Sequence, residues 1–207
     1  FIPLTFFSYD IASKLWVAFS IIAVIWVIYL CAKVYKMSFF SSINLFLASL
    51  VFLSFPLKFT LGMGQINLLI LLLVTFSFYF LNVNKNQKAG LFLAFPVLLK
   101  FFPLLLIPYF IFIKKLRFLA SFFLTVAALS LFTVLAMSFP VVYNYFHYSL
   151  PDLLSSWKGD YYNQALTGLL MRSVADVEAR HFLRIIIPCV LLIINFIVIF
   201  MHRKKSI

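Results

Sequence analysis

Long apolar runs separated by short polar breaks dominate this chain. A helix that crosses a bilayer needs about 20 apolar residues, within a range of about 17–25. Runs of this length, with only short polar interruptions, lie at 13–31, 39–57, 66–81, 118–139 and 185–201. The pattern therefore predicts an all-α, polytopic integral membrane protein with about five full spans.

A further apolar run, 89–113, is interrupted by Lys100 and Pro103, and it has two interpretations. As a single crossing, it would place Lys100 near the bilayer centre at a cost of about 2.5–3.5 kcal/mol. As a broken helical hairpin, its limbs 89–99 and 102–113 would each be about 16 Å long, with Lys100 at the tip, facing a cavity open to the outside. Because turns at that depth persist only where they line protein or a wet cavity, the hairpin would need such surroundings. We favour the hairpin.

The composition excludes two classes of protein. Hydrophobic residues make up 65% of the chain and charged residues 11%, whereas a soluble domain has about 45–50% and about 25%. Disordered chains are poor in aromatic residues, and this chain has 28 Phe. We expect one transmembrane domain over 1–207, with a long outer segment at about 140–184. Because residue 1 is Phe, we interpret the sequence as a fragment or a processed chain.

The net charge of +12 comes from basic residues that sit in short loops between the apolar runs. This distribution follows the positive-inside rule, so we exclude nucleic-acid binding and place the basic loops in the cytoplasm. With the hairpin, this arrangement puts all five acidic residues on the outer side: Asp10, Asp152, Asp160, Asp176 and Glu178. We therefore expect a multi-pass protein of the cell (inner or plasma) membrane whose polar chemistry faces away from the cytoplasm.

Two stretches carry polar groups beside the apolar runs, and each also has a purely structural interpretation. In 62–67, Gln65 and Asn67 follow two glycines, which permit tight turns; a capped helix start would look the same. In 99–103, Lys100 has no acidic neighbour in the sequence, so its partner is expected to be a substrate anion such as a lipid phosphate. The structural alternative is a lysine that snorkels to the interface.

A third stretch, 161–172, is the most polar and aromatic part of the outer segment. The amides of Asn163 and Gln164 suit a carbohydrate, and Arg172 suits a phosphate that it would bind through two hydrogen bonds. An ordinary interfacial helix is the alternative.

Other signals are weak. The three histidines fit no metal site by their spacing, and His181 is expected on a solvated helix face. Ser173 and Asp176 resemble a capping box, which would start a helix that leads into the last span.

The order and spacing of these stretches resemble glycosyltransferase family 87, over roughly residues 1–185. The residues that carry the resemblance are Gly64-Gln65-Ile66-Asn67-Leu68-Leu69, Ala89-Gly90, Leu99-Lys100-Phe101-Phe102-Pro103-Leu104, Arg117, Asn163-Gln164-Ala165-Leu166-Thr167-Gly168 and Arg172. The family belongs to the polytopic GT-C class and includes the polyprenol-phosphate-mannose-dependent α-1,2-mannosyltransferase.

The resemblance implies a GT-C-type hexosyltransferase that moves a sugar, often mannose, from a polyprenyl-phosphate donor to a lipid or glycan acceptor, with no metal or other cofactor. It implies that Lys100 and Arg172 bind the lipid-linked phosphate. Sugar or phosphate would be oriented by the remaining site residues: Gln65, Asn67, Asn163 and Gln164. GT-C enzymes carry the catalytic carboxylate in their first outer loop, so we expect this residue upstream of Phe1 and no transfer by the fragment alone.

Two other functions remain open. A multi-span transporter or flippase also uses broken helices and a cation within the membrane, although such proteins usually show internal repeats and we find none here. The other is a non-catalytic membrane subunit.

Overall fold

The computed structural model describes residues 2–156 and 165–202, and throughout these ranges the regular elements are helices. The chain divides into two compact units, Phe1–Phe132 and Thr133–Ile207. The prediction of one membrane domain stays a prediction.

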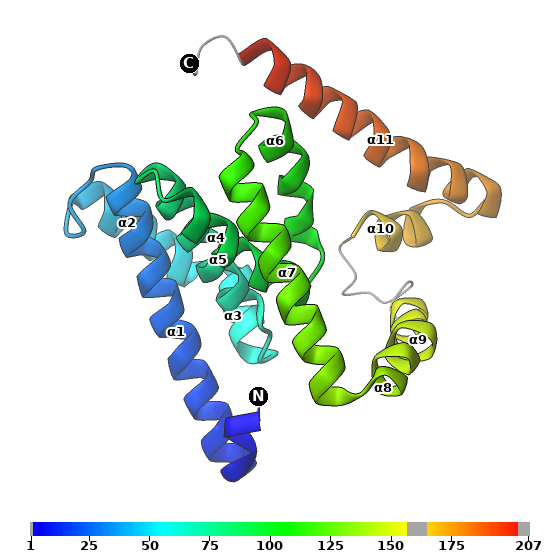
Figure 1. The fold of residues 1–207 in the computed structure, drawn as a ribbon, viewed down its shortest axis with the longest axis horizontal. Helices are drawn as coiled ribbons and strands as arrows, with labels where there is room; N and C mark the ends of the chain where they lie inside the picture. Colours follow the sequence, from blue (N-terminus) through cyan, green and yellow to red (C-terminus); the bar gives the residue numbers. More distant parts are fainter. Residues whose placement is uncertain (1, 157–164, 203–207) are drawn as a thin grey trace. The chain divides into compact units, whose positions relative to one another are not determined.

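The first unit is built around a central helix pair (Figure 1). In it, α4 (Asn67–Asn82) packs against α5 (Asn86–Leu99) and against the long helix α1 (Tyr9–Val34). A buried hydrogen bond joins the central pair, because the hydroxyl of Ser77 donates to the carbonyl of Ala89 over 2.8 Å. The other elements of this unit are η1 (Ile2–Phe6), α2 (Ser42–Leu53), α3 (Phe55–Gly62), η2 (Phe102–Leu106), α6 (Ile107–Phe112) and the beginning of α7 (Leu116–Met137).

The second unit contains short helices followed by one long helix. The short elements are α8 (Phe139–Asn144), a π-helical turn η3 (Tyr145–Ser149), α9 (Leu150–Ser156) and α10 (Leu166–Ser173). The long helix α11 (Val177–His202) continues through Pro188. Its first turn is capped by Asp176, whose carboxylate accepts the backbone N–H of Glu178 over 3.1 Å. Ser173 instead ends α10, so the predicted capping box is wrong, although a helix does lead into the last apolar run and begins at Val177.

Three helices of the described chain are long and apolar enough to cross a membrane, or up to four if the bent pair α2 and α3 forms one span. The long ones are α1, α7 and α11. The model supports a helical membrane protein, but it does not support the five full spans that the apolar runs predict.

Two of the predicted spans are shorter or broken for identifiable reasons. The run 39–57 bends by 51° between α2 and α3, where Pro56 lies in the first turn of α3 and has no N–H to continue the preceding helix. The helix α4 has 16 residues, which gives about 24 Å against a hydrocarbon core of about 30 Å.

The run 89–113 forms a hairpin, with α5 as one limb and η2 and α6 as the other. The helix ends at Lys100, whose backbone is extended (φ −150°, ψ 132°), and the chain returns so that Phe110 packs in one buried cluster with Ala89 and Leu93 of α5. The open ends of the two limbs meet α7, because Ser121 donates a hydrogen bond to the carbonyl of Gln87 over 2.7 Å. The reversal of the chain rules out a single straight crossing.

The helices α1, α3, α4 and α6 end in the same way. In each, the second residue of the following turn has a positive φ: Lys36 (54°), Gly64 (60°), Asn84 (58°) and Lys114 (54°). The next backbone N–H bonds a carbonyl five residues earlier, as in the pair Met37 and Ala32 at 2.8 Å. This is the Schellman motif, which satisfies the last carbonyls of a helix.

Candidate functional site

The turn between α3 and α4 brings the amide side chains of Gln65 and Asn67 to one place. Gly64 takes the left-handed conformation there, at φ 60°, and its N–H bonds the carbonyl of Leu61 over 3.2 Å. Residues with a Cβ atom rarely adopt this conformation. The glycine therefore allows the chain to close the α3 end and start α4 within a few residues.

Lys100 lies against this turn. Its ammonium Nζ donates to Asn67 Oδ1 over 2.7 Å, across 33 residues of sequence. In turn, Asn67 Nδ2 donates to Gln65 Oε1. Three of the six residues that the sequence predicts as a substrate site are thus joined in one hydrogen-bonded chain, which we call the Lys100 cluster (Gln65, Asn67 and Lys100).

The Lys100 cluster has the electrostatics of an anion site. An amide oxygen holds the ammonium without cancelling its charge, and within the described chain no carboxylate pairs with Lys100. The side chain is exposed at the hairpin tip, and an ammonium has three N–H donors. At least one donor and the full positive charge therefore remain for a negatively charged ligand.

A groove adjoins the same turn. It has a volume of about 650 Å³ and lies between the beginning of α1 and the end of α3, where Gly62, Met63 and Gly64 form part of its wall. Tyr9 and Trp16 of α1 contribute aromatic surface, and further lining comes from the hydroxyl residues Thr5 and Ser13. Aromatic rings with nearby hydroxyl groups suit the faces and edges of a sugar.

The aromatic and hydroxyl residues of the groove were not singled out from the sequence, because such side chains are ordinary in and beside an apolar span. Asp10, in the first turn of α1, does not line the groove. Its carboxylate pairs with Lys14 over 2.7 Å, and both side chains are exposed. No catalytic role follows for Asp10 from these contacts.

The other predicted site residues belong to the second unit. Arg172 lies in the last turn of α10 and is exposed. Asn163 and Gln164 lie outside the described residues. Their predicted roles, and that of Arg172, stay predictions.

A family model describes nearly the whole chain: the model of glycosyltransferase family 87 matches residues 1–206. The chain belongs to glycosyltransferase family 87. Membership implies glycosyltransferase activity in general, and the apolar helices agree with a membrane enzyme of this family. No curated protein and no solved structure was found to match the chain.

Proposed function

We propose that this family 87 chain takes part in moving a hexose, mannose in the first instance, from a polyprenyl-phosphate donor to a hydroxyl group of a lipid or glycan acceptor. The reaction would take place on the non-cytoplasmic face of the cell membrane, in a GT-C-type enzyme. The observation that carries the proposal is the Lys100 cluster, an exposed cation at a hairpin tip with amide groups beside it.

In this reaction the acceptor oxygen attacks the anomeric carbon of the donor sugar, and the bond from that carbon to the phosphate oxygen breaks. The phosphate leaves with an additional negative charge. An ammonium at Lys100 stabilises that charge where it develops, which is the most effective use of an electrostatic group in catalysis. The single displacement inverts the configuration of the sugar.

The acceptor hydroxyl loses its proton in this step, and a carboxylate is the base that we propose. We assign no acidic residue of this chain to that role. Gln65 and Asn67 orient the donor through hydrogen bonds, and Asn67 also holds Lys100 in place. The groove between α1 and α3 offers the adjoining surface for the sugar.

The direct test is Lys100→Ala in the full-length protein, reconstituted with polyprenyl-phosphate mannose and an acceptor lipid extract. We expect transfer to fall at least tenfold at equal expression. Lys115→Ala is the matched control. It removes the same charge, but from the turn after α6. Turnover close to that of the unchanged protein in Lys100→Ala would refute the assignment.

The same proteoliposomes separate the alternatives. A flippase would carry the lipid-linked sugar across the bilayer and form no glycosylated product. The proposed donor is supported if product forms with the polyprenyl-phosphate sugar and does not form when a nucleotide sugar is supplied in its place.

A further inference from the structure

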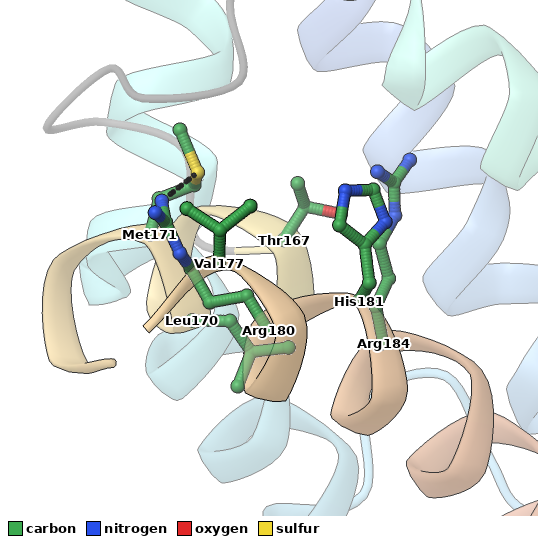
Figure 2. Close-up of a pocket in the computed structure, with 7 residues that line it drawn as sticks. All are labelled: Thr167, Leu170, Met171, Val177, Arg180, His181 and Arg184. Atoms are coloured by element: carbon green, nitrogen blue, oxygen red, sulfur yellow. Dashed lines mark hydrogen bonds between the residues drawn. The ribbon is translucent and has the colours of Figure 1, made fainter. Parts of the chain in front are cut away.

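A second basic site lies in the other unit, between α10 and the first turns of α11. A pocket of about 260 Å³ opens there. Its polar lining comes from Thr167, Arg180, His181 and Arg184, and its apolar wall from Leu170, Met171 and Val177 (Figure 2). Among the residues that the structure describes, no acidic side chain lines it.

The basic residues share one helix face. Arg180 and Arg184 are four residues apart on α11, so their side chains project from the same side of the helix. Figure 2 shows the hydroxyl of Thr167 on the side of the pocket where the His181 ring and Arg184 lie, while Arg180 reaches to Met171. Donors from two helices, Thr167 of α10 with His181 and Arg184 of α11, therefore lie on one side of the pocket, and Arg180 lies toward Met171.

Arg180 is held in place before any ligand binds. Its guanidinium donates to the carbonyls of Asp176 and Ala175, each at 3.3 Å, and Nη1 lies 2.9 Å from Met171 Sδ. These partners carry no net charge. The two acidic residues nearest in the sequence are Glu178, which does not line the pocket, and Asp176, whose carboxylate caps the helix through the N–H of Glu178.

Among the described residues, no protein group therefore balances the positive charge of the pocket. Within the described chain, no ion pair joins Arg180, His181 or Arg184 to a carboxylate. Like charges four residues apart on a helix repel each other, so the arrangement is more stable with an anion between them. A guanidinium presents paired N–H donors that match a phosphate.

The position of the pocket indicates where the phosphate comes from. Arg184 is the last charged residue before the apolar run of α11, which begins at Ile185, and such residues lie at the headgroup level of a bilayer. The buried Leu170 and its apolar neighbours face the same volume. The pocket volume lies just below the range of about 300–1,000 Å³ that is typical for small-molecule sites, which fits a headgroup phosphate but not a complete lipid-linked sugar.

We infer that the pocket between α10 and α11 binds the phosphate group of a membrane lipid, separately from the sugar donor. Thr167 and His181 donate hydrogen bonds to it, and Arg184 and Arg180 neutralise it. The inference requires only that α11 enters a membrane, and it does not depend on the proposed sugar transfer.

The experiment measures lipid binding by the purified full-length protein in nanodiscs of phosphatidylcholine with increasing phosphatidic acid, by native mass spectrometry. We expect Arg180→Gln with Arg184→Gln to weaken retention of phosphatidic acid at least tenfold. Lys114→Gln with Lys115→Gln removes the same charge from the turn after α6, and we expect less than a twofold effect. Equal losses in the two variants, or unchanged retention in the first, would overturn the inference.

Two further arms keep the test decisive. If the double variant fails to fold, Thr167→Val and Arg184→Gln are tested singly, and each should weaken retention about threefold or more. Inorganic phosphate in hundredfold excess should not displace phosphatidic acid. If inorganic phosphate displaces phosphatidic acid, the proposal that a membrane lipid supplies the phosphate is wrong, because the apolar wall would then contribute nothing to binding. Sugar transfer is assayed on the same samples, so failure of this inference and failure of the proposed function give different results.

Discussion

Gly90 of α5 and Phe118 of α7 are in backbone contact. A Cβ atom on Gly90 would lie 2.3 Å from the carbonyl oxygen of Phe118 and 2.9 Å from the backbone nitrogen of Phe122. The ring of Phe118 also lies 4.0 Å, centroid to centroid, from the ring of Phe110. The missing side chain at residue 90 therefore lets α7 close the open end of the hairpin.

We expect Gly90→Ala to destabilise the protein, because the obstructing atoms belong to the backbone and cannot rotate away. The cost should be about 1–3 kcal/mol, the range for overpacked sites, and thermal unfolding in detergent would measure it. Gly62→Ala is the control, since a Cβ atom there meets nothing within 4 Å. A helical Gly→Ala change in open space is neutral or favourable by up to about 1 kcal/mol. Equal melting temperatures for the two variants would contradict the close approach.

Asn67 and Lys100 should act as a unit in sugar transfer. Asn67→Ala removes the oxygen that holds the ammonium, so we expect a fall of about five- to tenfold in initial rate. Because residues in one network are not additive, the double variant with Lys100→Ala should be no slower than Lys100→Ala alone by more than about twofold. Initial rates of the four proteins complete this cycle. If the fall in rate of the double variant equals the product of the falls in the two single variants, Asn67 does not act through Lys100.

Lys36 and Lys114 occupy turn positions that favour glycine, at φ 54° in both. Because a left-handed backbone costs a residue with a Cβ atom about 1–2 kcal/mol, Lys114→Gly should leave stability unchanged or raise it by up to about 1 kcal/mol. Lys115→Gly loses the same charge at a residue outside the left-handed conformation and should lower stability. Unfolding midpoints of the two variants in one detergent would decide the matter. A larger loss in Lys114→Gly than in Lys115→Gly would be incompatible with the turn.

The hairpin also predicts a pattern of labelling. In a background with Cys31 and Cys189 replaced by Ser, a cysteine at Phe101 should react from outside intact cells with a membrane-impermeant maleimide. Cysteines at Lys88 or Lys115 should react only after permeabilisation, because both open ends of the hairpin share one side. Labelling of residues 88 and 115 from opposite sides would exclude the hairpin.

The interrupted run around Lys100 was predictable because local chemistry decides it. Pro103 has no N–H to continue a helix, and the charge of Lys100 is costly in lipid. Both the sequence pattern and the structure therefore place the break at Lys100. The apolar runs 13–31 and 185–201 lie within the longer helices α1 (Tyr9–Val34) and α11 (Val177–His202). The family resemblance carried by these motifs is confirmed by the family model over residues 1–206.

What the sequence could not show depends on contacts between distant residues. The bond between Lys100 and Asn67 joins helices that local patterns treat separately. The bend at Ser54 was missed because the run 39–57 carries no charge and is apolar enough to be interpreted as one span, although Pro56 marks the break. His181 is exposed, as expected, but it also lines a pocket because α10 packs beside α11, which no periodicity within one helix can reveal.

The short limbs of the hairpin also constrain how the protein is made. The limb α5 is 14 residues long, about 21 Å, and the returning limb has fewer residues. Neither limb is therefore long enough to span a hydrocarbon core of about 30 Å by itself. The broken backbone at Lys100 would meet lipid with unsatisfied polar groups unless other helices surround it. Because Asn67 of α4 contacts the tip of the hairpin and α7 closes its open end, we expect α5 and α6 to settle in the membrane together with these helices rather than one limb at a time.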